Sequence, residues 1–531
     1  MVSCCCGTCD LLRDPPTVNW SAWRSSLLVV CRCHADPTTS SDDAGGAIVS
    51  TRTDTSPHGS ERFKRSLGRI EIFFIGFGAM IGFGWITSTS TWLNDAGMLG
   101  AAIAFVIGGA IMGLVGLVYA ELVAAMPLAG GEHNYLMRGF GPRLAFIGSW
   151  GIIGGYISVA AFEAVAIPRT VAYIVPDVYT IPLWGVAGSQ VYLVWALIGT
   201  VTSIVLTALN IRGIKAASLL QSSVIIFLVV MAFALVGLSL FEGDTTNAEP
   251  LFTDSAGLLA VLVVVPFFFV GFDVIPQSAE EVKVPPHKVG RLVIVSVAMA
   301  TAFYVAIIVT TGLALPASEM QDFDLVTAEA MAALSGEFWG NLVVAGGLAG
   351  LLTSWNAFLI GASRLMWAMA NSGMLPAWFA KLHPQHKTPV NALLFIGAIC
   401  AVAPFFGEVM MGWLVDSSSV SIVITYLLVS AVFIVLRRRE PEMDRPLRVG
   451  GRSAGGGIAV GVAAVITTAC LLALYVPGMP AMLDVQPYVI LGLWWLLGVV
   501  FLVRVPGGVA PGEDAEERLL ERLAERRSSV S

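Results

Sequence analysis

Charged side chains are scarce in this chain of 531 residues. Asp, Glu, Lys and Arg together make up 13% of it, whereas hydrophobic residues make up 56%. A soluble domain averages about 25% charged residues, and apolar runs of about 20 residues cross a membrane as helices. The composition therefore excludes an ordinary soluble domain and predicts an all-α polytopic membrane protein.

Reactive clusters are also missing. The apolar runs contain no paired histidines, no Cys–His set and no carboxylate-rich metal motif. A polytopic membrane enzyme would need such a cluster at one interface. The sequence therefore predicts neither an enzyme nor a bound metal or cofactor, and it shows no feature of nucleic-acid binding.

The apolar runs predict about twelve membrane spans. They lie at 70–93, 98–123, 143–175, 190–210, 215–241, 256–282, 289–315, 338–370, 389–407, 410–436, 455–477 and 487–504. If the N-terminus is inside, 29 of the 30 Lys and Arg residues fall on inside segments, and only Arg169 lies near an outer end. Because basic loops stay in the cytoplasm, we expect a multi-pass protein of the cytoplasmic membrane with both termini cytoplasmic.

Three regions follow from this pattern. Residues 1–60 are rich in Ser, Thr, Asp and Pro and carry six of the eight cysteines, which predicts a disordered cytoplasmic tail. Those cysteines could bind metal or be acylated, but their spacing matches no zinc pattern. The next methionine after Met1 is Met80, so translation could also start at a non-Met codon such as that of Val49. Residues 61–505 form the membrane domain, and 506–531 a cytoplasmic tail with a short helix.

The first span is interrupted by small residues between Gly76 and Gly84. Glycine weakens a helix and lets a ligand touch the main chain, and the amides of a restarting half-helix favour an anion. We expect these amides to bind a carboxylate. The predicted contacts are Ala79, Met80, Ile81, Gly82, Phe83 and Gly84. The alternative is close helix packing through Gly78-x-x-x-Gly82.

The sixth span is interrupted by the stretch from Pro266 to Asp273, in which Pro266 removes a helical donor. Carbonyls from about Val263 to Phe269 would be freed and would suit an ammonium group, while neighbouring rings close over the ligand. The predicted contacts are Phe267, Phe268, Phe269, Val270, Gly271, Phe272 and Asp273. The alternative is that the four phenylalanines face lipid.

The two broken spans start five spans apart, so they cross the membrane in opposite directions. Paired, oppositely oriented broken spans indicate the substrate site of a transporter. Donors on one side and acceptors on the other match a zwitterion such as an α-amino acid. A channel is disfavoured, because bulky phenylalanines at the midplane favour occlusion over an open pore.

Few ionisable residues lie within the spans, and such residues are candidates for function. Glu163 lies in the middle of the third span, where it could carry a proton or make structural hydrogen bonds. Asp273 lies at the second break, where it could cap the next half-helix or contact substrate or protons. Glu121 and Arg364 lie toward the cytoplasmic ends, where gating or structural pairing is expected.

Ten short motifs occur in order along the chain. They are Gly78-Ala-Met-Ile-Gly-Phe-Gly84, Tyr119-Ala-Glu-Leu122, Met126-Pro-Leu-Ala-Gly-Gly-Glu132, Gly271-Phe-Asp273, Ala279-Glu-Glu-Val282, Trp355-Asn-Ala-Phe358, Ala362-Ser-Arg-Leu-Met366, Leu375-Pro376, Arg437-Arg-Arg-Glu-Pro441 and Arg445-Pro-Leu-Arg448. Together they resemble the amino acid–polyamine–organocation (APC) superfamily over roughly 62–505.

This resemblance implies an inverted five-plus-five (LeuT-like) repeat with helices 1 and 6 broken at the midplane. The halves would be spans 1–5 (about 70–241) and 6–10 (about 256–436), with spans 11 and 12 (about 455–504) added. It also implies secondary transport of amino acids or amines by alternating access. Carboxylate contacts carry over to Met80 through Gly84, and amino-group contacts to carbonyls near Phe267, Phe268 and Val270.

The coupling ion is open between proton and sodium. Some proton-coupled members of the superfamily place a lysine in span 5, but residues 216–241 contain no Lys or Arg. Sodium-coupled relatives bind the ion where Thr353 and Ser354 fall, with carbonyls near Gly78 and Ile81; hydroxyls that bond their own helix are the alternative. A proton on Glu163 or Asp273 is favoured, because a buried carboxyl prefers its neutral form. The prediction is proton-coupled amino acid symport, with an ethanolamine or polyamine carrier or exchanger as the alternative.

Overall fold

The structure of the chain is a computed structural model that describes residues 63–504, except 64, 83, 321, 322, 324, 452, 453, 477, 480 and 481. The chain divides into two units, Met1–Gly59 and Ser60–Ser531, of which the second contains all described residues. The predicted tails, 1–60 and 506–531, lie outside the described residues. So does Phe83, one of the predicted contacts.

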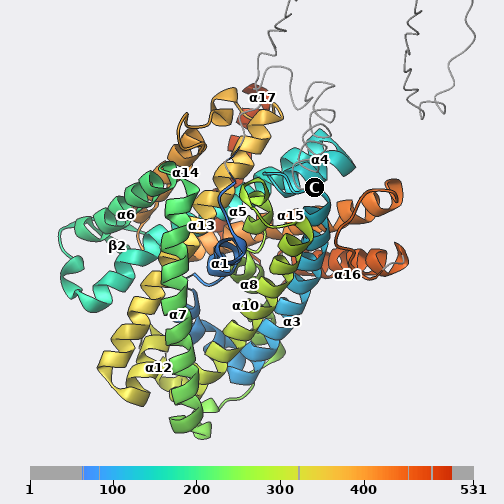
Figure 1. Cartoon of the computed structure of the whole chain (residues 1–531). Helices are drawn as coiled ribbons and strands as arrows, with labels where there is room; N and C mark the ends of the chain where they lie inside the picture. The colour runs from blue at the N-terminus through green and yellow to red at the C-terminus, as the bar shows by residue number, and fades with distance from the viewer. Residues whose placement is uncertain are drawn as a thin grey trace, which may run out of the picture. The chain divides into compact units, whose positions relative to one another are not determined.

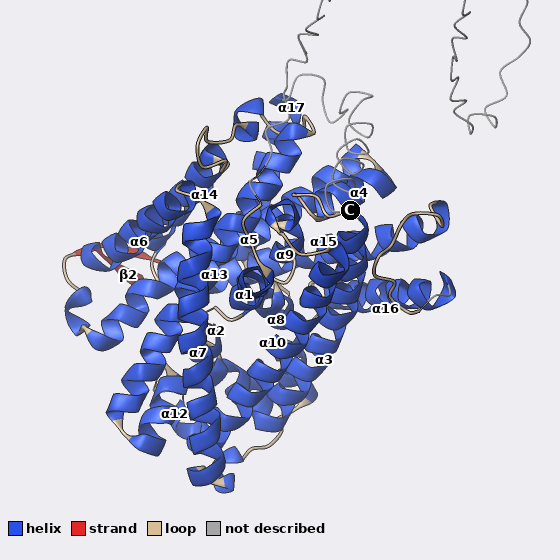
Figure 2. Cartoon of the chain, in the orientation of Figure 1, coloured by secondary structure: helices blue, strands red, loops and turns tan. Residues whose placement is uncertain are grey.

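Helices make up most of the described chain, and the only strands described there form one short hairpin (Figure 2). The helices are α1 (Arg69–Met80), α2 (Gly84–Thr87), α3 (Thr89–Ala125), α4 (Glu132–Phe140), α5 (Pro142–Ile174), α6 (Leu193–Ile211), α7 (Ile214–Glu242), α8 (Ser255–Phe269), α9 (Val274–Gln277), α10 (Pro286–Ala314), α11 (Ala317–Met320), α12 (Val326–Ser335), α13 (Glu337–Asn371), α14 (Val390–Val402), α15 (Met410–Arg439), α16 (Ala454–Ala473) and α17 (Val485–Arg504). The hairpin pairs β1 (Pro182–Val186) with β2 (Ser189–Tyr192), and the 3-10 turns are η1 (Pro176–Val178), η2 (Thr245–Ala248), η3 (Ala279–Glu281), η4 (Ala377–Ala380) and η5 (Ala403–Phe406).

Eleven helical segments of the described chain are long and apolar enough to cross a membrane, rather than about twelve. The segment predicted at 389–407 is a shorter apolar helix, Val390–Phe406. Pro404 explains the difference, because proline has no N–H to donate to a continuing α-helix. The α-helix accordingly ends at Val402 and the chain continues as the 3-10 turn η5.

The first predicted break is present. Helix α1 ends at Met80, the chain leaves the helical conformation at Ile81 (φ −103°, ψ 64°), and α2 begins at Gly84. The first span then continues into α3 and ends at Gly97, whose φ of 72° and ψ of 167° are not helical. Gly97 therefore marks the boundary between the first two predicted spans, and beyond it the amides of Leu99 and Gly100 donate to the Leu251 carbonyl at 2.8 and 3.3 Å.

The second break is present too, but it lies after the proline rather than at it. Helix α8 continues through Pro266 to Phe269, and α9 begins at Val274. The segment between them is opened by Gly271, whose φ of 129° is a conformation that residues with a Cβ rarely adopt. The carbonyl of Val263 is also not free, since the Tyr475 hydroxyl donates to it at 2.8 Å.

Helix α1 lies in the middle of the helices that carry the site. It packs against α7, α10 and α13, and it meets α9 (Figure 1). Around it, α3 packs along α8 and α10, and α5 packs along α13 and α15. Both breaks are therefore enclosed by helices rather than exposed at the outside of the bundle, as backbone at membrane depth requires.

Candidate functional site

The two breaks lie against each other. A Cβ placed on Gly271 would come within 2.5 Å of the Ala79 side chain and within 3.1 Å of the Met80 amide nitrogen. A Cβ on Gly84 would overlap the ring of Phe268. Gly84 and Gly271 thus also let the two broken helices approach each other.

Other helices surround the first break with polar groups. The Tyr304 hydroxyl of α10 donates to the Met80 carbonyl at 2.6 Å, and the Ser354 hydroxyl of α13 donates to the Ala79 carbonyl at 3.2 Å. A Cβ on Gly82 would overlap the Glu163 carboxylate and lie 2.9 Å from the Ser354 hydroxyl. Gly82, Glu163 and Ser354, predicted separately, therefore meet at one place.

The second break offers acceptors. The last turn of α8 exposes the carbonyls of Phe267, Phe268 and Phe269, which accept no hydrogen bond from the described residues. Such carbonyls at a helix C-terminus carry a partial negative charge. This end of α8 is suited to an ammonium group.

The four phenylalanines are buried, so the prediction that they could face lipid is wrong. Phe267, Phe268, Phe269 and Phe272 are each at most 6% exposed. The Phe268 ring packs edge-on against Trp92 with 4.9 Å between centroids, and Phe272 packs between Tyr119 and Tyr426. The rings form an aromatic wall beside the breaks.

The predicted sodium ligands are only partly brought together. Ser354 reaches the first break, and the carbonyls of Ile81 and Gly82 lie close to the α13 backbone at Gly350. The Thr353 hydroxyl instead donates to the Gly350 carbonyl of its own helix at 2.8 Å. A Cβ on Gly78 would point at Gln221 and Ile225 of α7.

Asp273 does not cap α9 with its side chain, so that prediction is wrong. Its Oδ1 accepts from the Gly271 amide at 2.9 Å, and the Tyr426 hydroxyl donates to its Oδ2 at 3.2 Å. The residue is in the helical region (φ −77°, ψ −11°), whereas a capping residue is usually extended. Asp273 therefore braces the loop of its own break.

Two polar groups at the site escaped the sequence reasoning. One is Glu132 at the start of α4, whose Oε1 accepts from Gln277 at 2.6 Å. The other is a chain of buried amides, in which Asn210 donates to Asn356, Asn356 to Gln221, and Gln221 to the Phe74 carbonyl. The motif Met126–Glu132 contained the first, but nothing in its spacing indicated its partner.

Buried ion pairs hold the ends predicted to be cytoplasmic, as expected for Arg364 and Glu121. Arg364 donates to Glu281 at 2.8 Å, and Glu121 accepts from Arg437 at 2.9 Å and pairs with Arg445 at 3.1 Å. Burial raises the pKa of Glu281, and the Arg364 guanidinium opposes this rise. These are structural pairings rather than parts of the breaks.

The chain before α1 forms backbone hydrogen bonds with the segment that contains Glu281. The amides of Ser66 and Leu67 both donate to the Glu281 carbonyl, at 2.9 and 3.0 Å, and Lys283 donates back to the Leu67 carbonyl at 2.9 Å. The Phe63 ring packs edge-on against Trp367, 4.6 Å between centroids. The hydrogen bonds join the chain before α1 to the chain after α9.

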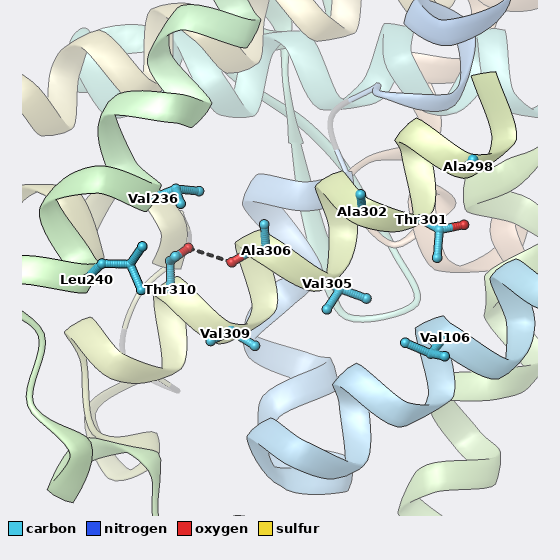
Figure 3. A pocket seen from close by; sticks show the side chains of 10 residues that line it. All are labelled: Val106, Val236, Leu240, Ala298, Thr301, Ala302, Val305, Ala306, Val309 and Thr310. Carbon is cyan, nitrogen blue, oxygen red and sulfur yellow. Dashed lines mark hydrogen bonds between the residues drawn. The ribbon is translucent and has the colours of Figure 1, made fainter. Parts of the chain in front are cut away.

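An apolar groove lies elsewhere, between α3, α7 and α10 (Figure 3). Its lining residues are Val106, Val236, Leu240, Ala298, Thr301, Ala302, Val305, Ala306, Val309 and Thr310. The Thr310 hydroxyl donates to the Ala306 carbonyl at 2.8 Å. A lining without charge suits apolar chains and offers nothing to a zwitterion.

A family model described as amino acid permease matches residues 67–502. The chain belongs to this amino acid permease family. It is a multi-pass membrane transporter and not an enzyme, and the resemblance to the APC superfamily is confirmed.

Curated relatives agree with this membership. The permease is 25% identical to the branched-chain amino acid permease BcaP of Bacillus subtilis over 413 residues, 76% of this chain and 87% of the relative. It is 27% identical to a methylthioribose transporter of the same species, over 73% of this chain and 85% of the relative. It is 25% identical to an aspartate-proton symporter, also from that species, over 74% and 76%.

Proposed function

We propose that this permease carries α-amino acids across the cytoplasmic membrane, with both termini on the cytoplasmic side. The observation that carries the proposal is the pair of facing breaks. We assign the substrate carboxylate to the amides from Gly82 to Gly84, because the Ile81 amide donates to the Phe77 carbonyl at 3.2 Å. We assign the ammonium to the free carbonyls of Phe267, Phe268 and Phe269. The name of BcaP supports an amino acid as cargo.

Alternating access is the proposed mechanism, with the inverted five-plus-five repeat as its framework. The site is buried, so substrate needs one side to open at a time. The hydrogen bonds between Ser66, Leu67 and Glu281 hold one side shut, and they break if α1 swings outward there. Backbone bonds of this kind can re-form with water, which suits a gate.

Protons are the proposed coupling ion. Glu163 touches the first break and Asp273 lies in the second, so each could link protonation to the shape of a break. Of the two hydroxyls in the sodium alternative, that of Ser354 bonds the first break, whereas that of Thr353 donates to its own helix. A relative named as an aspartate-proton symporter also favours protons.

An amine carrier is the second candidate. One relative is named as a methylthioribose transporter, so the family membership alone does not require an amino acid substrate. A polyamine would need acidic groups lining the site, and Asp273 is occupied by Gly271 and Tyr426. This favours the zwitterion over a polyamine.

Uptake by purified permease in proteoliposomes tests the proposal. Radiolabelled leucine, aspartate, arginine, ethanolamine and putrescine are compared under an inward proton gradient in sodium-free buffer and under an inward sodium gradient at equal pH. We expect one or more amino acids to accumulate with the proton gradient alone. Accumulation of amines only, or strict dependence on sodium that is lost in Ser354→Ala, would overturn it.

A further inference from the structure

Two buried acidic residues, Glu132 and Asp273, both bond to Gln277. Glu132 and Asp273 are both 0% exposed. The Gln277 side chain donates to Glu132 at 2.6 Å, and its backbone amide donates to the Asp273 carbonyl at 3.3 Å. Glu132 comes from α4 and Asp273 from the second break, so the fold brings together two acids 141 positions apart in the chain.

No Lys or Arg side chain forms an ion pair with either acid among the described residues. On α13, Arg364 donates to Glu281, and on α4 the His133 ring faces the hydroxyls of Ser149 and Ser372. Burying each unpaired charge costs several kcal/mol, and two like charges raise that cost.

Tyrosines from four helices surround the acids. Tyr426 of α15 donates to Asp273, Tyr156 of α5 lies beside the same carboxylate, and Tyr119 of α3 and Tyr135 of α4 are in electrostatic reach of Glu132. The ring of Tyr119 lies 6.3 Å from that of Tyr135 and 5.9 Å from that of Tyr426. The groups facing the pair are thus neutral donors and one amide.

Several polar atoms of this cluster have no hydrogen-bond partner in the described chain. They are Glu132 Oε2, Gln277 Oε1, Tyr119 Oη, Tyr135 Oη and Tyr156 Oη. Buried polar atoms are nearly always satisfied by protein or water. Five unsatisfied atoms around two acids without an ion-pair partner indicate that something is bound there. A hydrogen on a carboxyl oxygen supplies both a donor and a compensating positive charge.

We propose that Glu132 and Asp273 together hold one transported proton. An O–H bond forms on one of the two carboxyls, while the other remains a carboxylate that accepts from tyrosine hydroxyls, so the pair carries one negative charge instead of two. The inference rests on the proposed proton coupling, and it assigns the proton to this pair rather than to Glu163.

The pair is also connected to the assigned substrate site. Asp273 Oδ1 holds the Gly271 amide, and Gly271 sets the opening of the second break where the ammonium is assigned. Protonation at Asp273 weakens its acceptor strength toward that amide and loosens the loop. Proton binding and the shape of the amino-group site are therefore linked through one side chain.

Infrared spectroscopy of the purified full-length permease tests the site without requiring transport. A protonated buried carboxyl gives a C=O stretching band that a carboxylate lacks. We expect one such band at neutral pH in the wild type, lost or shifted in Glu132→Gln and in Asp273→Asn and kept in the matched variant Glu163→Gln. Absence of the band in wild type, its persistence in both pair variants, or its loss in Glu163→Gln alone would overturn the assignment.

Transport separates this inference from the proposed function. In proteoliposomes, Glu132→Gln should lose proton-driven accumulation down to the level of empty liposomes, while counterflow, which needs no net proton movement, is reduced less. Wild-type failure to accumulate under a proton gradient would contradict the proposed coupling, whereas full proton-driven uptake by Glu132→Gln would contradict the proton pair. Binding of ²²Na⁺ that disappears in Glu132→Gln would assign the cluster to a metal cation instead.

Discussion

The two breaks are built in opposite ways. The first is bare backbone held by its neighbours, because Tyr304 and Ser354 donate into its carbonyls from other helices. The second is flanked by large rings and braces itself, because Asp273 accepts from the Gly271 amide two residues away. The first break is therefore sensitive to any side chain that fills its space, and the second to loss of its internal brace.

Filling the first break should have the largest effect. Gly82→Leu would place a side chain where the Glu163 carboxylate and the Ser354 hydroxyl already lie, so we expect transport to be abolished at normal membrane levels. Radiolabelled uptake measures transport, and quantitative blotting measures the amount of permease in the membrane. Gly113→Leu is the matched control, since a Cβ there meets nothing within 4 Å, and near wild-type uptake by Gly82→Leu would refute the site.

A substitution that stiffens the second break should have the second-largest effect on transport. Gly271→Ala must keep a φ of 129° and place a Cβ 2.5 Å from the Ala79 side chain. Such strain costs of order 1–3 kcal/mol, so we expect the initial uptake rate to fall roughly tenfold. Gly141→Ala is a control with a positive φ but open space. If both variants lose the same activity, backbone strain alone is responsible.

Removing one ring of the aromatic wall should have a smaller effect. Phe268→Ala or Phe272→Ala deletes a buried ring from the wall beside the breaks, and an aromatic contact is worth about 1 kcal/mol. We expect at least one of the two to raise the apparent KM about fivefold or to broaden substrate selectivity. Concentration series with competing amino acids measure this, and wild-type kinetics in both variants would show that the rings serve packing alone.

Deleting residues 2–55 should have no effect on transport. The deletion removes the cysteine-containing segment but leaves Phe63, which packs against Trp367. Initial rates per mole of protein should match the full chain. Lost uptake at normal membrane levels of the protein would show that the N-terminal segment with its cysteines contributes to transport.

Local patterns were enough to predict most of the fold. Glycine between 76 and 84 and proline at 266 indicated both breaks, since each residue weakens a helix by its own chemistry. The second break lies in the last part of the predicted stretch 266–273, because the opening depends on Gly271 rather than Pro266. Pro404 shortened the ninth predicted span for a reason that was also visible in the sequence.

The polar contacts could not be predicted in the same way. Glu132 meets Gln277 across 145 positions, and Asn210, Asn356 and Gln221 come from three helices. No periodicity within one segment encodes which side chains face each other across helices. Asp273 was recognised as unusual for its place in a span, but its bond to Gly271 depends on loop geometry that the sequence does not show.

Competition by altered amino acids tests most directly the central claim that the paired breaks bind a zwitterion. For an amino acid the permease transports, inhibition of uptake is measured with the unlabelled compound, its methyl ester and its decarboxylated amine. Both derivatives leave the amides of the first break without a carboxylate. Because a hydrogen bond to a charged group is worth about 1.5–3 kcal/mol, the ester and the amine should each inhibit at least about tenfold more weakly. Equal inhibition by the amine would contradict the assignment of the first break to the carboxylate and favour an amine carrier.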